Sequence, residues 1–299
     1  MSRSTVPSAR GTSPGRPTGD FVLTLACPDR PGIVHEVAGF LVEHGGNIVE
    51  SQQFDDLITD RFFMRVDFAV AEPTSAEDLR AAFAPVAERF GMTYELWQAG
   101  APYRTLIMVS KQLHCLNDLL FRHSTGSLQV EIPAVVSNHP DAERLCAAYG
   151  VDFHHVPVTA DTKPEAEARL MELVESLDID LVVLARYMQV LSDDVCRRLE
   201  GKVINIHHSF LPSFKGARPY HQAHQRGVKI VGATAHYVTG DLDEGPIIEQ
   251  DVARVDHSMT PKELVRLGSD TESLVLARAV RRHVEHRILL NGHRTVVFR

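Results

Sequence analysis

Two short stretches combine residue types that can do chemistry on a carbonyl group. In the first, "VINIHHSFLP" (203–212), an apolar run leads into Asn205, His207 and His208. In the second, "GDLDEGP" (240–246), three carboxyl groups stand in a loop that glycine and proline make tight. An amide N–H and an imidazolium can stabilise an oxyanion, and a carboxylate can orient an imidazole or take a proton from water. Together these groups suit attack by water on a carbonyl carbon, without a metal or a covalent nucleophile.

The order of residues in the first stretch places the amide and the first imidazole on one face of a strand. Alternate side chains of a strand share a face, so Asn205 and His207 point one way and the neighbouring isoleucines the other. Both polar residues stand at the carboxyl end of the predicted strand, where parallel sheets bind ligands. The alternative is a pair of satisfied polar residues that only end a loop. A second predicted strand, Val231–Tyr237, weakens that alternative because it brings His236 close to the 240–246 loop.

The elements that must position these residues alternate between apolar runs and amphipathic stretches from residue 103 onwards. Such alternation predicts a doubly wound, mostly parallel sheet. The predicted strands cover residues 101–110, 129–139, 151–158, 202–208, 231–237 and the start of 178–191, and the predicted helices cover 113–126, 141–150, 163–177, 192–201 and 260–289.

A separate module precedes this part of the chain, over residues 20–98. Its strands are predicted at 21–26, 47–56, 61–70 and 93–99, and its helices at 31–44 and 75–91, with Ser75 as the N-cap of the second. The order βαββαβ predicts a ferredoxin-like sandwich. We expect a linker at 99–104, a catalytic domain at 105–299, and a disordered tail at 1–19, where Ser, Pro, Gly and Arg dominate.

Composition excludes several classes of protein. A net charge of -8 argues against a protein that coats nucleic acid, and no apolar run reaches the roughly 18 residues of a membrane span. The four cysteines are far apart in the sequence and form no CxxC pair, which favours reduced thiols and a cytoplasmic location. The pairs His154–His155 and His221–His224 lack a carboxylate at a metal-site spacing, so we expect no metal and no cofactor.

The N-terminal stretch "CPDRPGIVHEVAGFLVEHGGNI" (27–48) resembles the start of an ACT domain, a regulatory module that often binds amino acids. The resemblance implies an effector site between two paired modules, and hence a homo-oligomer. The effectors that we expect are glycine or methionine. The alternative is a packing module without a ligand. The residues that the resemblance assigns to the effector are Asp29, Arg30, Pro31, Gly32, Ile33 and Asn47.

The pattern "NIHHSFLP…GARPYHQA…GATAHYV…LDEGPII" resembles the formyltransferase family that uses formyltetrahydrofolate, over residues 103–299. The resemblance implies that Asn205, His207 and Asp243 are catalytic. For His208 we expect a role in placing water or in shielding the acceptor side; the alternative is an imidazole that only packs against the loop. The resemblance also implies that the pterin is held largely by backbone groups. The folate-binding residues it assigns are Tyr187, Met188, Gln189, Val190, Leu191, His236, Gly240, Asp241 and Leu242.

Three departures point to the hydrolytic members of that family, which pass the formyl group to water. "VSKQLHCLNDLL" (109–120) has no glycine where a nucleotide-accepting member has a Gly-rich phosphate turn. His208 stands where transferases have proline, and an ACT-like module precedes the catalytic domain with no tRNA-binding domain expected after it. The implied reaction turns 10-formyltetrahydrofolate into tetrahydrofolate and formate, which balances folate pools and supplies formate for purine synthesis. The rivals are a formyltransferase to an amine acceptor and a non-catalytic folate-binding regulator.

Overall fold

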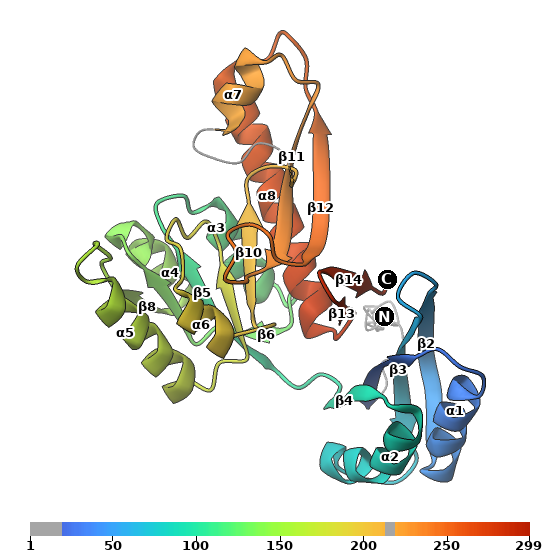
Figure 1. Ribbon diagram of the computed structural model, residues 1–299. Helices are drawn as coiled ribbons and strands as arrows, with labels where there is room; N and C mark the ends of the chain where they lie inside the picture. The colour runs from blue at the N-terminus through green and yellow to red at the C-terminus, as the bar shows by residue number, and fades with distance from the viewer. Residues whose placement is uncertain (1–19, 213–218) are drawn as a thin grey trace, which may run out of the picture. The chain divides into compact units, whose positions relative to one another are not determined.

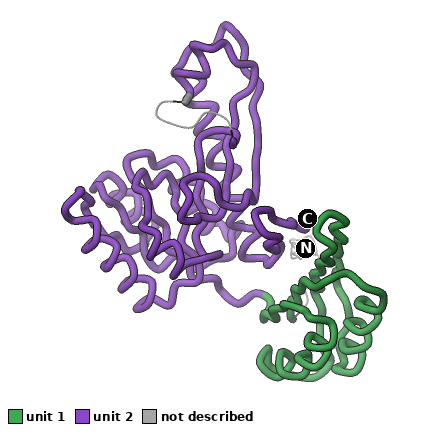
Figure 2. Tube along the Cα trace, viewed as in Figure 1, with its two compact units in different colours: residues 1–99 green, residues 100–299 purple. Residues whose placement is uncertain are grey.

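The structure, a computed structural model, describes residues 20–212 and 219–299. The predicted tail at 1–19 lies outside the described residues. Contacts divide the chain into two compact units, which meet in sequence at Ala99 and Gly100 (Figure 2). Each unit has its own hydrophobic core, so each is described by itself.

The N-terminal unit is a four-stranded antiparallel sheet with two helices, and it confirms the predicted ferredoxin-like order. Its strands lie side by side in the order β2-β3-β1-β4. The Ser75 side chain accepts a hydrogen bond from the Asp78 N–H, which confirms the predicted cap. The elements are β1 (Phe21–Pro28), α1 (Ile33–Glu43), β2 (Gly46–Asp56), β3 (Arg61–Val70), α2 (Ala76–Phe90) and β4 (Thr93–Gln98).

The C-terminal unit contains an eight-stranded sheet, whose main path runs β12-β11-β10-β9-β5-β7-β8. Strands β10, β9, β5, β7 and β8 are parallel, whereas β11 and β12 are antiparallel additions at one edge. This confirms the predicted mostly parallel sheet. The strands are β5 (Tyr103–Val109), β6 (Val130–Glu131), β7 (Ala134–Ser137), β8 (Asp152–His155), β9 (Leu181–Leu184), β10 (Val203–His207), β11 (Ile230–Tyr237) and β12 (Ile247–Arg254).

Helices cover both faces of this sheet (Figure 1). Helices α3, α4 and α8 pack on the face that carries Ile204 and Ile206, whereas α5 and α6 pack on the other. The two central isoleucines of β10 are therefore buried, as their alternation with Asn205 and His207 predicts. The helices are α3 (His114–Ser124), α4 (Glu143–Tyr149), α5 (Lys163–Ser176), α6 (Asp193–Arg198), α7 (Pro219–Gln225) and α8 (Pro261–Val284).

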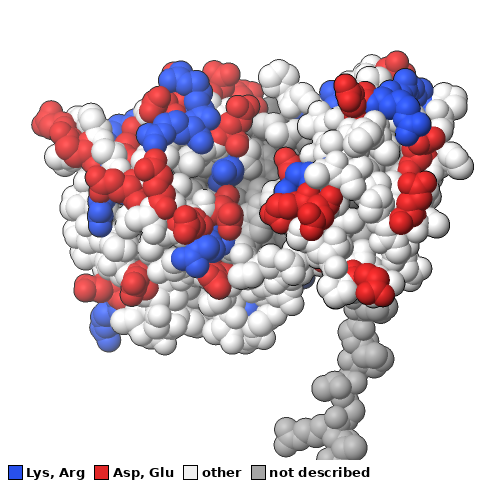
Figure 3. All heavy atoms as spheres, turned by 90° about the horizontal axis from the view of Figure 1, so that it is seen from below, with Lys and Arg blue, Asp and Glu red and all other residues white. Residues whose placement is uncertain are grey.

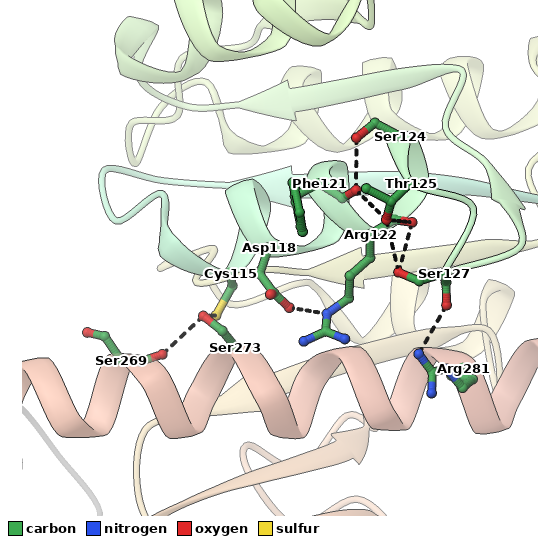
Figure 4. A network of polar contacts seen from close by, with 10 residues as sticks. All are labelled: Cys115, Asp118, Phe121, Arg122, Ser124, Thr125, Ser127, Ser269, Ser273 and Arg281. Atoms are coloured by element: carbon green, nitrogen blue, oxygen red, sulfur yellow. Dashed lines mark hydrogen bonds and ion pairs between the residues drawn. The ribbon is translucent and has the colours of Figure 1, made fainter.

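Polar contacts join α3 to α8 at both ends of their interface (Figure 4). The Ser273 hydroxyl lies 4.0 Å from the Cys115 sulfur, and an Arg281 N–H donates to the Ser127 carbonyl at 3.0 Å. Between them, Arg122 pairs with Asp118 within α3 at 2.7 Å. These contacts fix α8, the longest helix, along the face of the sheet on which α3 packs.

Several predicted boundaries differ from the structure. The predicted strand 129–139 is two short strands, β6 and β7, because Pro133 cannot donate to a sheet ladder. By contrast, the predicted strand at the start of 178–191 is confirmed: β9 stops at Leu184, and the chain then turns into a pocket wall. The predicted C-terminal helix 260–289 ends at Val284. A hairpin that the sequence patterns did not show follows, formed by β13 (Ile288–Asn291) and β14 (Arg294–Val297).

The buried imidazole of His283, in the last turn of α8, predicts a pH dependence of stability. Its Nδ1 lies 2.7 Å from the Tyr237 hydroxyl, and its Nε2 has no hydrogen-bond partner among the described residues. Burial lowers the pKa of His283 from 6.5 to about 4. Between pH 6.5 and pH 4 the imidazole therefore binds a proton in the unfolded chain but not in the folded chain. The free energy of unfolding falls as the pH drops through this range.

We expect the free energy of unfolding to fall by about 2 kcal/mol between pH 7 and pH 5 because of this one group. Urea unfolding at the two pH values, followed by circular dichroism, measures the loss. His283→Phe is expected to remove that part of the pH dependence, whereas His293→Gln, at an exposed position in the β13–β14 turn, is expected to retain it. Equal pH slopes for the wild type and His283→Phe would contradict the assignment.

Candidate active site

A pocket of about 260 Å³ lies at the carboxyl ends of β9 and β10. The sheet explains its place. The chain leaves β5 towards β7 and β8 and then returns to β9 on the opposite side of β5, so the loops after β5 and β9 diverge. Three segments form most of the wall: residues 186–191 after β9, the end of β10 with His208, and residues 238–243 after β11.

The structure brings all the predicted catalytic and folate-binding positions into this one pocket. Its lining includes Asn205, His207, His208 and Asp243, which come from segments up to 38 residues apart in the sequence. The predicted folate-binding positions that line the same pocket are Tyr187, Met188, Gln189, Val190, Leu191, His236, Gly240, Asp241 and Leu242. Arg186 and Cys196 also line it, and neither was singled out from the sequence.

The carboxylate of Asp243 faces the imidazole of His207. Asp243 Oδ1 lies 3.2 Å from His207 Nδ1 and 3.8 Å from His236 Nε2. The hydrogen bond from His207 is the main cause that holds the pKa of Asp243 below 3.8, and the nearby imidazoles add to it against the effect of burial. Asp243 is therefore ionised at neutral pH and can orient the ring and stabilise its charged form.

Backbone conformation delivers this carboxylate to the imidazole. Asp243 has a φ of 58°, in the left-handed region that acidic and amide side chains tolerate better than most. Two residues later, a Cβ on Gly245 would lie 1.8 Å from the carbonyl oxygen of Tyr237, so this close approach requires glycine. The loop after β11 is thus folded tightly back against its own strand, with Asp243 turned towards β10.

Asn205 is held by His236 on the neighbouring strand. The two residues are directly opposite in the antiparallel β10–β11 ladder, and Asn205 Nδ2 lies 3.2 Å from His236 Nε2. His236 Nδ1 lies 2.8 Å from the Tyr237 carbonyl, which can only accept, so Nδ1 carries a proton. Burial, the largest effect, lowers the pKa of His236. Neutral Nε2 therefore accepts from the Asn205 amide, which leaves the second amide N–H for a ligand.

This contact gives His236 a role in positioning Asn205, which the sequence did not reveal. We expect His236→Phe to lower kcat by about fivefold, since one net hydrogen bond of about 1 kcal/mol orients the amide. Steady-state kinetics of the two proteins measure the effect. Tyr237→Phe, on the same strand with its ring in the core on the other face, is the matched control and should retain kcat. An unchanged kcat in His236→Phe would contradict this role.

The chain directly after the two histidines of β10 is pinned by a buried hydroxyl. Thr234 on β11 donates to the Ser209 carbonyl at 2.9 Å and accepts from the Leu211 N–H at 3.1 Å. Gln250 on β12 donates to the Leu211 carbonyl at 3.1 Å and to the Thr234 hydroxyl at 2.9 Å. The rings of His207 and His208 lie 4.7 Å apart, and both residues line the pocket. The backbone that carries them is held by the β10–β11 ladder before His208 and by these hydrogen bonds after it.

The predicted effector residues of the N-terminal unit do not form one cluster within a single chain. The Asp29–Gly32 turn follows β1 at the end where Pro28 pairs with Arg61 of β3, whereas Asn47 pairs with Ala69 near the other end of β3. Eight residues of β-strand span about 27 Å. Arg30 donates to the Arg89 carbonyl and stacks on Phe90, and Ile33 is buried in the core.

One group of metal-ligating residue types occurs among the described residues: His114, Cys115 and Glu272, with ligand atoms within 4.8 Å of one another. The Arg186 guanidinium lies 3.4 Å from Glu272, and burial together with Glu272 raises the pKa of the Cys115 thiol far above its usual range. A neighbouring cation and a protonated thiol both disfavour metal binding at this cluster.

Comparison with known proteins agrees with the arrangement of the two units. The formyl transferase family pattern matches residues 103–280, and the ACT domain pattern matches residues 21–84. In sequence, the chain is 57% identical to a formyltetrahydrofolate deformylase of Corynebacterium sp. (strain P-1), over 93% of this chain and 98% of that protein. It is 42% identical to a formyltetrahydrofolate deformylase of Escherichia coli (strain K12), over 92% and 97% of the two chains.

Solved structures show the same likeness. A formyltetrahydrofolate deformylase from Burkholderia mallei superposes with a TM-score of 0.89 at 53% identity, covering 93% of this chain and 99% of that one. A glycinamide ribonucleotide transformylase from Symbiobacterium toebii superposes with a TM-score of 0.64 at 29% identity, covering 68% and 96%. With an ACT unit, a formyltransferase unit and this coverage, the chain belongs to the formyltetrahydrofolate deformylase family.

Proposed function

We propose that this protein hydrolyses 10-formyltetrahydrofolate to tetrahydrofolate and formate, with Asn205, His207 and Asp243 as the catalytic residues. One observation carries the assignment of residues: the Asp243 carboxylate lies 3.2 Å from the His207 imidazole in the pocket that Asn205 also lines. An ionised acid, an imidazole and an amide donor around one cavity are the groups that addition of water to a formyl carbon requires.

The proposed reaction begins with a water molecule held between the Asp243–His207 pair and the formyl carbon. As the water oxygen attacks, its proton passes to the pair, and the ionised Asp243 stabilises the imidazolium that forms. The free amide N–H of Asn205 and the His207 ring donate to the developing oxyanion. The bond between carbon and N10 then breaks and the proton held by the pair goes to N10. Tetrahydrofolate and formic acid leave, and the acid releases its proton to solvent to give formate.

The pterin is proposed to bind along the 187–191 segment and the 240–242 loop, largely through backbone groups. Both segments line the pocket, and the exposed side chains of Met188, Val190 and Leu242 offer apolar surface to a flat ring. His208 also lines the pocket, where we propose that it shields the water side of the formyl group. The reaction as proposed requires no cofactor besides the folate substrate.

Water is proposed as the only acceptor. The turn that follows β5 carries no glycine, and in the described structure it is occupied by side chains: Ser110 and Gln112 bond to the 186–188 segment, and Leu113 packs on the core. A backbone cradle for a phosphorylated acceptor is therefore not favoured there. Acidic and basic side chains are intermixed on the face in Figure 3, which suits a small-molecule substrate better than nucleic acid.

Formate release tests the proposed function. Purified protein is incubated with 10-formyltetrahydrofolate in buffer without any amine, and formate and tetrahydrofolate are measured together. We expect both products in a 1:1 ratio. A formyltransferase would give no formate, and it would give tetrahydrofolate and a formylated amine only after an amine acceptor is added. A non-catalytic folate-binding regulator would give neither formate nor tetrahydrofolate. Either result would overturn hydrolysis as the function.

The ACT unit is proposed to bind glycine or methionine between two copies in a homo-oligomer. Two copies can bring the Asp29–Ile33 turn of one chain to Asn47 of another, which a single chain cannot do. Calorimetry with each amino acid, and hydrolysis assays in its presence, test the effector, and sedimentation tests the oligomer. No heat with either amino acid would remove both effectors from the proposal.

A cytoplasmic location is proposed from the cysteines. All four are free and buried, as in proteins kept in a reducing compartment. Over residues 20–212 and 219–299, no helix has both the length and the apolar character needed to cross a membrane.

A further inference from the structure

A buried carboxylate outside the catalytic set lies beside the pocket. Glu272, on α8, is 1% exposed, and its two oxygens contact three side chains from three other parts of the fold. His114 Nε2 lies 2.8 Å from Oε2, the Tyr220 hydroxyl donates to Oε1 at 2.6 Å, and Arg186 Nε lies 3.4 Å from Oε2. Of these residues only Arg186 reaches the pocket wall.

The contacts keep this carboxylate ionised. Burial alone raises the pKa of Glu272, but the hydrogen bond from His114, the charge of Arg186 and the hydrogen bond from Tyr220 together bring it below 4.5. A buried charge with this many partners has a preferred position, because losing any partner leaves it uncompensated. Glu272 is thus a fixed anion at the end of the sheet where the β5 and β9 loops diverge.

Arg186 is the first residue of the pocket segment after β9, and its backbone is strained. Its φ is 64°, a left-handed value that residues other than glycine adopt at an energetic cost and keep only where the surrounding structure holds them. The side chain is held by Glu272 and by Gln112, whose Oε1 accepts from Arg186 Nε at 2.9 Å. The Arg186 backbone carbonyl accepts from the Ser110 N–H at 3.2 Å, and the Met188 N–H donates to the Ser110 hydroxyl at 2.9 Å.

Tyr220 binds the other oxygen of Glu272, and its ring packs into a notch on α8 that Gly268 leaves open. A Cβ on Gly268, one turn before Glu272 on α8, would lie 2.1 Å from Tyr220 Cζ. Only glycine at this point of the helix lets the ring pack against the helix backbone and point its hydroxyl at Oε1. The notch and the hydroxyl therefore act together to set the position of the carboxylate.

We propose that Glu272 is a positioning residue for folate binding: it holds the strained Arg186 turn, and Arg186 sets the start of the 187–191 segment against which the pterin lies. This inference rests on the proposed function, since it assigns that segment to folate. Glu272 touches neither the substrate nor the reacting atoms. Loss of the Glu272 charge should therefore weaken folate binding and leave the chemical step intact, because β10 and the loop after β11 position Asp243, His207 and Asn205.

The test separates binding from chemistry. Glu272→Gln retains size but removes the charge, and we expect KM for 10-formyltetrahydrofolate to rise at least tenfold while kcat stays within threefold. The Kd for tetrahydrofolate, measured by calorimetry, should rise in parallel. Tyr220→Phe retains the ring in its notch and loses only the hydroxyl, and we expect KM to rise about threefold. Glu249→Gln is the matched control. Glu249 lies on β12 and forms an ion pair with Arg282, which is on α8 like Glu272 but does not contact the pocket segment, so this variant removes an ion pair of α8 without changing Arg186.

Glu249→Gln is expected to leave KM and Kd unchanged, even if it lowers the melting temperature. If Glu272→Gln loses melting temperature while KM and Kd stay at the wild-type values, Glu272 is only structural and the inference fails. If Glu272→Gln does not fold, Tyr220→Phe decides by the same readouts. Absence of formate release by the wild type would defeat the proposed function instead, and that result is visible before any variant is compared.

Discussion

Asp243→Asn is expected to lower kcat for formate release by about 10³-fold while tetrahydrofolate still binds. The amide has almost the size of the carboxylate, so the pocket keeps its shape, but it carries no charge to stabilise an imidazolium and accepts no proton. General acid–base groups contribute about 10²–10⁴-fold to rates. The low pKa of Asp243 means that wild-type protein has this charge throughout the neutral range, so the deficit of the variant should persist from pH 6 to pH 8.

Asp241→Asn is the matched control for this experiment. It removes the same charge two residues earlier in the same loop, where the exposed side chain contacts neither imidazole in the described structure. We expect it to change KM rather than kcat, since Asp241 lies in the pocket lining and is proposed to contact folate. If both variants lost kcat equally, the general charge of the loop would matter and the specific contact with His207 would not. A kcat near the wild-type value in Asp243→Asn would refute its catalytic role.

Asn205→Ala is expected to lower kcat by about 10²–10³-fold, the usual effect of removing one oxyanion donor. The Asn205 amide has two N–H groups. One donates to His236, and the other is available to donate to a ligand in the pocket. Alanine removes the donor, and it also leaves His236 Nε2 without its partner on β10. Rapid-quench measurement of a single turnover reports the chemical step directly, and equilibrium binding of tetrahydrofolate should change by less than threefold.

A second variant distinguishes loss of the donor from loss of volume at this position. Asn205→Asp keeps the shape, replaces both N–H donors with an acceptor, and adds a negative charge near Asp243. We expect it to be at least as slow as Asn205→Ala, and slower above the pH at which the new carboxyl ionises. A turnover near that of the wild type in either variant would show that the oxyanion is held elsewhere.

Local patterns were enough to predict most of the fold. The period of two in β10 put Asn205 and His207 on one face, and the period of helices delimited α1, α2 and α5 to within a few residues. These signals are local, because side-chain direction in a strand or helix depends on neighbours a few residues away. The strands β12, β13 and β14 were not predicted, because short strands and edge strands show too little alternation of apolar and polar residues to be distinguished from loops.

The sequence by itself determined which residue types stand at the carboxyl end of β10 and in the loop after β11. Its resemblance to the formyltransferase family predicted that Asn205, His207 and Asp243 act together. Only the tertiary structure decided the pairings: Asp243 with His207, Asn205 with His236, and Arg186 with Glu272. Those contacts join segments 31 to 86 residues apart. They depend on strand register and on where α8 packs, and no local pattern of residues encodes either of these.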